Sequence, residues 1–220
     1  FRVIKERDIA TVCTVPDGGL TRLLNLIEAD GKIGLVTLST EEEGIGIATN
    51  SKGHVFVFTR SNSAGGPAFG AAAAQLFEFD ENGKLLREVG KGLYAWSEAH
   101  SVRIDKNDNI WAIDKGSDMI IRFNPEGRVT MVFGRKKEAS DEAEPWTRVN
   151  PPRPPVNGQF RQPTDVAWDT EGNIYISDGY INSRVAKFSK DGDFIASIGE
   201  PGRTKLGELN TPHTIANDAK

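Results

Sequence analysis

Short apolar runs separated by polar turns recur along the chain in one repeated arrangement. Residues 102–104 and 110–113 flank a polar turn, and residues 166–168 with 174–176 and residues 45–48 with 55–58 repeat this spacing. A second pair of runs follows each of these, with a glycine in its turn at Gly83, Gly127 or Gly192. Strand-length runs bounded by Asn/Asp/Gly turns are typical of β-hairpins. The pattern therefore predicts an all-β chain.

Two hairpins per unit predict a four-stranded antiparallel blade. The turn glycines at 83 and 127 lie 44 residues apart, a spacing typical of β-propellers. A weaker copy, at 23–26 and 33–36 around Gly31, predicts another hairpin near the start of the chain. Because a propeller normally closes with more blades than these, we expect a partial ring.

The repeat boundaries predict a single β-propeller domain over residues 1–220. Its expected parts are a partial or divergent first blade at 1–43, blades at 44–92, 99–135 and 162–202, a Pro-rich insertion at 136–161, and the start of a next blade at 209–220.

Composition excludes several classes of partner. A net charge of −4 with mixed signs gives no basic stripe, so we expect no nucleic-acid partner. The apolar runs have the length of strands, so we expect no membrane span. The single cysteine, Cys13, excludes a disulfide within the chain and leaves the redox compartment open.

Two of the three histidines occupy the same position of the repeat. His100 stands in 99–105 and His213 in 212–218, each at the start of an expected inner strand, close to the central channel. Two converging imidazoles could begin a zinc site, which needs three or four ligands. Alternatively, each histidine only forms a hydrogen bond to a neighbouring blade. The third, His54, follows Gly53 in a turn and is expected to be exposed to solvent.

A second candidate lies in the segment 178–184, which follows a second strand at the rim of the channel. Tyr180 in this segment and Arg60 in another blade have related rim positions near the histidines. A tyrosine acts as a base near neutral pH only where positive charge stabilises the phenolate, which Arg60 and a divalent metal would supply. The alternative is structural: Tyr180 packs its ring and Arg184 pairs with Asp178.

The runs 160–167 and 176–185 carry a more specific resemblance. The repeat resembles the NHL-repeat family of six-bladed propellers, and these two runs resemble peptidyl-α-hydroxyglycine α-amidating lyase and its bacterial relatives. The resemblance covers residue 44 to the end of the chain. It implies a six-bladed ring of which this chain lacks the last blades.

The resemblance also implies roles for individual residues. His100 and His213 match two zinc histidines, Tyr180 matches the proposed base and Arg60 matches the arginine of the site. The backbone carbonyls of Ile47 and Val102 match positions that hold a structural calcium, a cation that accepts such oxygens. The third zinc histidine and an adjacent calcium-binding aspartate belong to a later blade that these residues do not include.

The implied function is a metal-dependent lyase that cleaves the C–N bond of a carbinolamide. A small peptide or N-acyl hydroxyglycine substrate would give an amide and glyoxylate. The competing hypothesis is a non-catalytic NHL-repeat propeller that binds a protein, peptide or glycan on its rim. A sugar-lactonase type of propeller would need acidic calcium ligands, and Asp165 alone offers little for that. The resemblance favours a secreted or periplasmic location over a cytoplasmic one.

Overall fold

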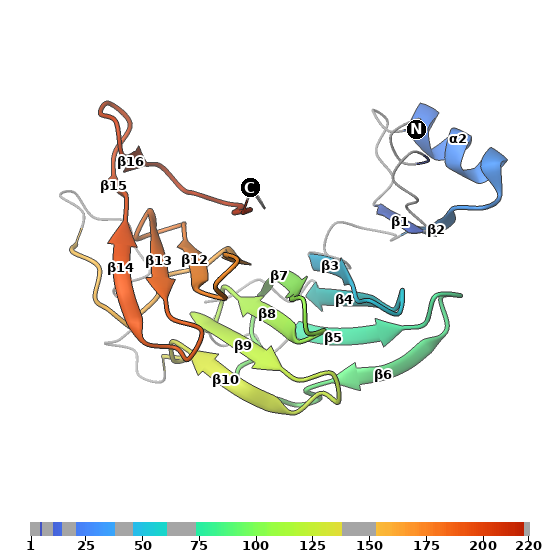
Figure 1. Cartoon of the computed structure of the whole chain (residues 1–220), viewed down its shortest axis with the longest axis horizontal. Helices are drawn as coiled ribbons and strands as arrows, with labels where there is room; N and C mark the ends of the chain where they lie inside the picture. Colours follow the sequence, from blue (N-terminus) through green and yellow to red (C-terminus); the bar gives the residue numbers. More distant parts are fainter. Residues whose placement is uncertain are drawn as a thin grey trace.

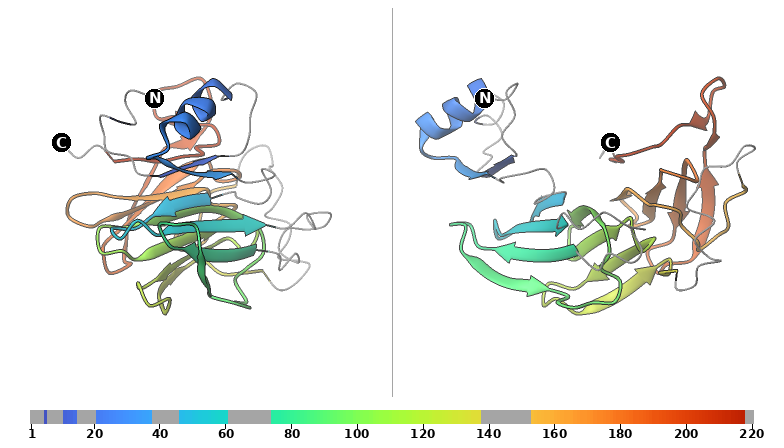
Figure 2. Two further views of the ribbon diagram at one scale, coloured as in Figure 1. Left: turned by 90° about the vertical axis from the view of Figure 1, so that its right-hand side faces the viewer. Right: turned by 180° about the vertical axis from the view of Figure 1, so that it is seen from behind.

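A computed structural model describes residues 5, 11–14, 21–37, 46–60, 74–137 and 153–217 of the chain. Within these residues, three four-stranded sheets follow one another along an open arc, with the N-terminal helix at one end and the start of the C-terminal segment at the other (Figure 1). The views in Figure 2 show the same arc from the side and from behind. The arrangement is that of successive propeller blades, so the predicted all-β fold of four-stranded antiparallel blades in a partial propeller is confirmed.

Each blade is a meander in which sequential strands pair antiparallel. The first blade contains β3 (Gly46–Thr49), β4 (Val55–Arg60), β5 (Ala74–Phe79) and β6 (Leu85–Val89). The second contains β7 (Ala99–Ile104), β8 (Ile110–Asp114), β9 (Met119–Phe123) and β10 (Val129–Phe133). The third contains β11 (Asp165–Trp168), β12 (Ile174–Asp178), β13 (Arg184–Phe188) and β14 (Phe194–Ile198).

The outer hairpin turns explain why the polar segments between the runs fold back. In the β5–β6 turn, the carboxylate of Asp80 accepts hydrogen bonds from the amides of Asn82 and Lys84, at 3.0 and 2.8 Å. Gly83 has φ +80°, a left-handed conformation that glycine adopts without steric cost. Gly127 and Gly192 have φ of +85° and +97° in the two corresponding turns. Local turn chemistry therefore fixes each hairpin.

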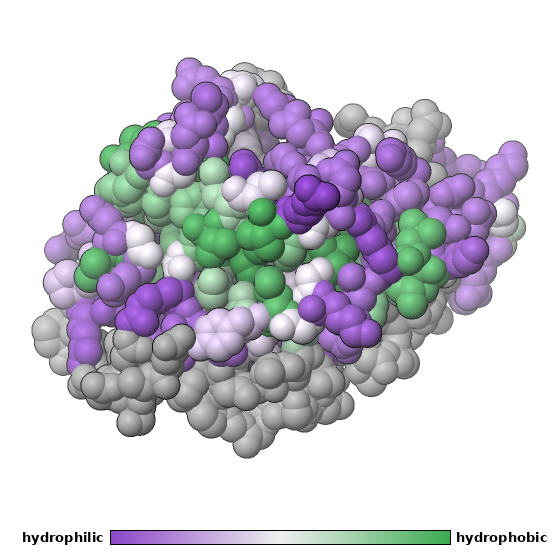
Figure 3. Space-filling model, turned by 90° about the horizontal axis from the view of Figure 1, so that it is seen from below, coloured by the Kyte–Doolittle hydropathy of each residue, from purple (hydrophilic) through white to green (hydrophobic). Residues whose placement is uncertain are grey.

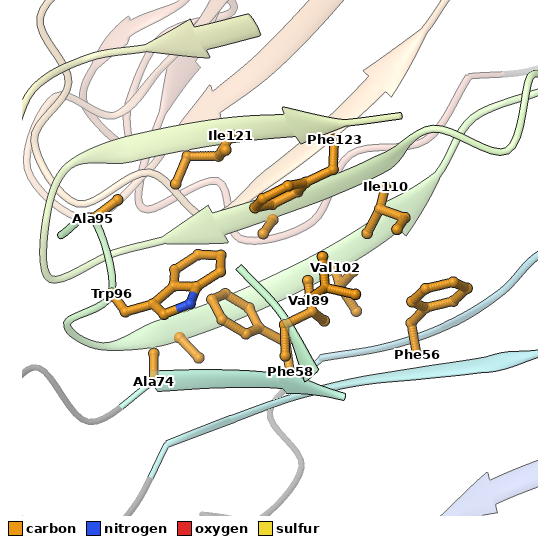
Figure 4. Packing of buried hydrophobic residues seen from close by; sticks show 13 residues of the cluster. Phe56, Phe58, Ala74, Val89, Ala95, Trp96, Val102, Ile110, Ile121 and Phe123 are labelled. Carbon is orange, nitrogen blue, oxygen red and sulfur yellow. The ribbon is translucent and has the colours of Figure 1, made fainter. Parts of the chain in front are cut away.

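Two apolar cores lie between adjacent blades. Figure 4 shows the first, where Phe58 of β4 packs against Trp96, which in turn packs against Phe123 of the next blade. The second joins the β7–β10 and β11–β14 blades through residues that include Trp111. Burial of these side chains is the main force that stacks the blades.

The outermost strands β6, β10 and β14 are the most exposed of each blade. Some large apolar side chains are exposed on them: Leu85, Leu86, Val129, Val132, Ile195 and Ile198. Figure 3 shows the molecule from below, where apolar patches lie among hydrophilic ones.

The hairpin predicted at 23–36 is wrong. Residues Thr21–Asp30 form the helix α2, and β2 (Gly34–Thr37) pairs in parallel with β1 (Thr11–Thr14). Leu23, Leu24 and Ile27 are spaced three and four residues apart, a helical period that a short apolar run does not distinguish from a strand. Gly31, at φ +63°, follows the last helical residue and suits the end of a helix. No described helix is long and apolar enough to cross a membrane.

The C-terminal segment forms no strand between residues 210 and 217. After the short parallel pair β15 (Glu200–Pro201) and β16 (Glu208–Leu209), it runs back toward the concave side of the arc (Figure 1). The backbone amide of Ile215 donates to Asp165 at 3.2 Å, and Asn217 Nδ2 donates to the carbonyl of Trp168 at 2.9 Å. The segment therefore lies beside β11, where the next blade was predicted to start.

Candidate functional site

The structure brings His100 and His213 together, although 113 residues separate them in sequence. Their Nε2 atoms lie 3.2 Å apart and their ring centroids 4.7 Å apart. His100 is the second residue of β7, and His213 belongs to the segment beside β11. The equivalent positions in the repeat thus converge, as the spacing predicted.

Tyr180 completes this cluster from the loop after β12. Its hydroxyl lies 2.9 Å from Nε2 of His213 and 3.4 Å from Nε2 of His100. The ring meets both imidazoles edge-on. A phenolic oxygen and two imidazole nitrogens therefore face one small space, and Tyr180 has a more specific place than ring packing alone.

The proton on His100 can be assigned from its surroundings. Its Nδ1 lies 2.7 Å from the carbonyl oxygen of Thr164, which only accepts, so Nδ1 carries the hydrogen and Nε2 keeps its lone pair in the neutral ring. Burial, together with the charges of His213, Lys115 and Arg60, lowers the pKa of His100 to about 4, against the hydrogen bond to Thr164, which raises it. His100 is therefore neutral near pH 7, with Nε2 aimed at His213.

This donor set fits the first ligands of a zinc ion. Zinc–nitrogen bonds of about 2.0–2.1 Å in a tetrahedron place two nitrogens about 3.4 Å apart, close to the 3.2 Å between the Nε2 atoms of His100 and His213. A carbonyl bonded to the second ring nitrogen, as at His100, is the usual support of a metal-binding histidine. Among the described residues, no group of three or more His, Cys, Asp or Glu side chains gathers at one place. The described residues therefore supply two imidazole ligands, with the Tyr180 hydroxyl beside them.

The carbonyl oxygen of Pro212 holds His213 in place. It accepts hydrogen bonds from the hydroxyls of Thr164, at 2.9 Å, and Ser177, at 2.8 Å. It also lies against Gly179, where a Cβ atom would overlap it. Sequence reasoning missed these contacts. In the sequence, only the residue types of Thr164, Ser177 and Gly179 pointed to these contacts, and serine, threonine and glycine occur at many positions for other reasons.

Arg60 and Lys115 form a cationic edge beside the cluster. Glu98 Oε1 accepts from Arg60 Nη1 at 2.6 Å and pairs with Lys115 Nζ at 2.8 Å. Lys115 Nζ also lies 4.9 Å from the centre of the Tyr180 ring. Arg60 was predicted at this rim, whereas Glu98 and Lys115 were not. The repeat aligns Lys115 with Arg60, at the end of the second strand of each blade, and this signal could have found Lys115. Nothing in the sequence marks Glu98.

The turn that carries Glu98 is held by the buried carboxylate of Asp114. Asp114 accepts from the backbone amides of Ser97 at 2.8 Å, Glu98 at 3.0 Å and Ser117 at 2.8 Å. Burial raises the pKa of the Asp114 carboxyl, and the three amide bonds oppose that rise. The cationic edge is therefore anchored in the interior of the blade.

The predicted calcium carbonyls lie on neighbouring inner strands, Ile47 on β3 and Val102 on β7. Gly46 permits these strands to approach, because a Cβ there would come within 2.6 Å of the Val102 nitrogen. Asp165 is unsuited to hold calcium here, since Arg103 binds both its oxygens, at 2.8 and 2.6 Å. The calcium assignment stays a prediction.

The prediction for His54 is wrong. Its Nδ1 lies 2.8 Å from Oε1 of Glu78, and its side chain is only 23% exposed. Glu78, at 7% exposure, also pairs with Arg87 of β6. His54 packs against the blade because the buried carboxylate of Glu78 requires hydrogen-bond donors. It takes no part in the His100–His213 cluster.

The chain is similar to curated proteins of peptide amidation. Over 211 residues it is 26% identical to "Probable peptidyl-alpha-hydroxyglycine alpha-amidating lyase pgal-1" of Caenorhabditis elegans, covering 88% of this chain and 53% of that protein. It is 28% identical over 141 residues to the rat "Peptidylglycine alpha-amidating monooxygenase", covering 61% of this chain and 13% of that protein. The chain thus spans only about half, or a smaller part, of these relatives. A mouse protein named "NHL repeat-containing protein 3" is 27% identical over 150 residues, covering 64% of this chain and 39% of that protein.

Solved structures share the fold. A structure titled "Streptogramin B lyase structure" matches 81% of this chain and 46% of its own, with a TM-score of 0.50 and 15% identity. A Bacteroides thetaiotaomicron protein of unknown function matches 79% of this chain and 42% of its own, with a TM-score of 0.51 and 14% identity. No protein-family model matches the chain. The homologues of this partial propeller are peptidyl-hydroxyglycine amidating lyases and NHL-repeat proteins, as its repeat predicted.

Proposed function

We propose that this propeller is a zinc-dependent carbon–nitrogen lyase that acts on N-acyl-α-hydroxyglycines, including peptidyl ones. The observation that carries the proposal is the convergence of His100 Nε2, His213 Nε2 and the Tyr180 hydroxyl within 3.4 Å of one another. The similarity to proteins named as amidating lyases supports the same reaction class.

In this proposal, His100 and His213 hold the zinc through their Nε2 atoms. Bound zinc would supply Lewis acidity toward the hydroxyl of the substrate. His100 suits this role because its neutral ring keeps a lone pair on Nε2 while Thr164 fixes its orientation. Calcium at the carbonyls of Ile47 and Val102 belongs to the same proposal as a structural ion.

Tyr180 acts as the general base of the reaction. The substrate hydroxyl loses its proton to the phenolic oxygen as its C–O bond becomes the carbonyl of glyoxylate. The electron pair of the breaking C–N bond goes to the amide nitrogen, which takes up the same proton from Tyr180, so no water is consumed. Lys115 Nζ lies 4.9 Å from the centre of the Tyr180 ring and places a positive charge beside this transfer. Arg60 orients the substrate carboxylate.

The test combines metal analysis with a glyoxylate assay on the purified protein. We expect zinc bound at close to one per chain, and release of glyoxylate from an N-acyl-α-hydroxyglycine. His100→Ala should lose the zinc, whereas His54→Ala should keep it, because His54 lies outside the cluster. Tyr180→Phe should keep the zinc and lose glyoxylate release. Glyoxylate release that survives Tyr180→Phe would remove Tyr180 from the mechanism.

A rim-binding module without catalysis is the second candidate. It is favoured by the similarity to a mouse protein that is named for its NHL repeats. Absence of zinc together with absence of glyoxylate release would select it.

A further inference from the structure

The cationic edge is built around a single carboxylate oxygen. Arg60 Nη1 and Lys115 Nζ both bind Glu98 Oε1, at 2.6 and 2.8 Å, so the two nitrogens are at most 5.4 Å apart. Each group has further N–H donors beyond the one that Glu98 uses. Two cations and one carboxylate leave an excess positive charge at this edge.

The edge is partly buried, which strengthens its field. The side chains of Arg60, Lys115 and Glu98 are 26%, 17% and 13% exposed. Charges at such positions are screened less by solvent than charges on the open surface. The positive charges of Arg60 and Lys115 reach His100, where both lower its pKa.

Lys115 is the member of the cationic edge that contacts the Tyr180–histidine cluster directly. Its Nζ is 4.9 Å from the centre of the Tyr180 ring, and the Tyr180 hydroxyl touches both histidines. In an α-hydroxyglycine, the hydroxyl and the carboxylate are attached to the same carbon. A hydroxyl placed at the Tyr180–histidine cluster therefore puts the carboxylate within reach of this edge.

We propose that Lys115 binds the substrate carboxylate together with Arg60, that it determines specificity for a free carboxylate, and that Glu98 is the positioning residue that holds the two cations at one spacing. This inference rests on the proposed function and adds to it the identity of the group that the site selects. A carboxylate has two oxygens, so it can accept from both cations at once.

The chain offers a matched control for Lys115. Lys136 Nζ lies 5.0 Å from the centre of the Tyr94 ring, so it makes the same kind of cation–aromatic contact on another part of the surface. Lys136→Met therefore removes an equivalent charge and contact without touching the cluster. Lys115→Met keeps much of the apolar length of the side chain and removes its charge.

The first measurement is ligand binding, which does not depend on turnover. N-acetylglycine carries the carboxylate without the reactive hydroxyl, and N-acetylglycinamide is its neutral counterpart. We expect calorimetric or NMR titration of the wild type to give at least tenfold tighter binding of the acid. Lys115→Met should abolish this preference, and Lys136→Met should leave it unchanged. Glu98→Gln should weaken acid binding about three- to tenfold, a cost of order 1 kcal/mol.

The second measurement is kinetic and separates the two proposals. With an N-acyl-α-hydroxyglycine, Lys115→Met should raise KM with a smaller change in kcat, and rates with the corresponding α-hydroxyglycinamide should change little. Acid preference lost in Lys115→Met in a protein that releases no glyoxylate would uphold the carboxylate site and overturn the reaction. Equal binding of acid and amide by the wild type, or a preference that survives Lys115→Met, would overturn the role of Lys115 even in an active lyase.

Discussion

The fully buried ion pair of Asp178 and Arg184 supports the loop that carries Tyr180. Asp178 and Arg184 are 0% and 1% exposed, and Asp178 Oδ2 accepts from Arg184 Nε at 3.0 Å. The same oxygen accepts from Asn182 Nδ2 at 2.6 Å, and Oδ1 accepts from the backbone amide of Arg161 at 2.9 Å. This one carboxylate therefore ties β12, β13 and the 161 segment together.

Asp178→Asn keeps the shape of the side chain and removes its charge. It leaves the guanidinium of Arg184 buried, with Nη2 still bonded to the carbonyls of Val156 and Gln159 at 3.1 and 2.9 Å. Breaking a buried pair on one side costs about 3–5 kcal/mol. For a chain of this length each kcal/mol lowers Tm by about 2–4 °C, so we expect Tm to fall by about 6–20 °C.

Thermal and urea unfolding followed by circular dichroism measure this change. Asp80→Asn is the matched control, because Asp80 accepts amide hydrogen bonds in an exposed turn that an asparagine oxygen can also accept. We expect it to change the free energy of unfolding by less than about 0.5 kcal/mol. The double variant Asp178→Asn/Arg184→Met should recover part of the loss, since it removes the stranded charge.

A loss below about 1 kcal/mol in Asp178→Asn would refute this reasoning, because that is the size of an exposed ion pair. A double variant less stable than Asp178→Asn would contradict the idea that the unpaired guanidinium carries the cost. Either result would mean that Arg184 is stabilised mainly by the carbonyls of Val156 and Gln159.

Three further predictions concern the site and the inner strands. Gly179→Ala should lower zinc affinity at least about tenfold in a chelator competition, because its Cβ would displace the Pro212 carbonyl that holds His213; unchanged affinity would contradict this. Gly46→Ala should cost about 1–3 kcal/mol in urea unfolding, since its Cβ would press on the backbone of β7; a neutral effect would show that β3 can move away freely. In chelator-treated protein, the pKa of His100 is about 4 in the folded state and 6.5 in the unfolded state. Between these values the unfolded chain binds more protons than the folded one, so the free energy of unfolding should fall as the pH drops from about 6.5 to 4. His100→Gln should flatten that slope, and an unaltered slope would place its origin in other groups.

Much of the blade architecture was predictable because its causes are local. Strand-length apolar runs and the turn glycines at 83, 127 and 192 fix each outer hairpin whatever the rest of the chain does. The same reasoning failed at residues 21–30, where an apolar run compatible with either a strand or a helix formed a helix. The repeat also placed His100 and His213 at equivalent positions, and this predicted their approach without any knowledge of distances.

The sequence by itself thus determined the hairpins, the blade repeat and the pair of histidines, because neighbouring residues and a repeated register decide these features. The tertiary structure alone decided what surrounds the pair. The Thr164 carbonyl that orients His100 is 64 residues away from it, and Glu98 joins Arg60 to Lys115 across two blades. Such contacts form only when blades stack through their shared apolar cores. They join single side chains from distant segments, and no local pattern along the chain records that pairing.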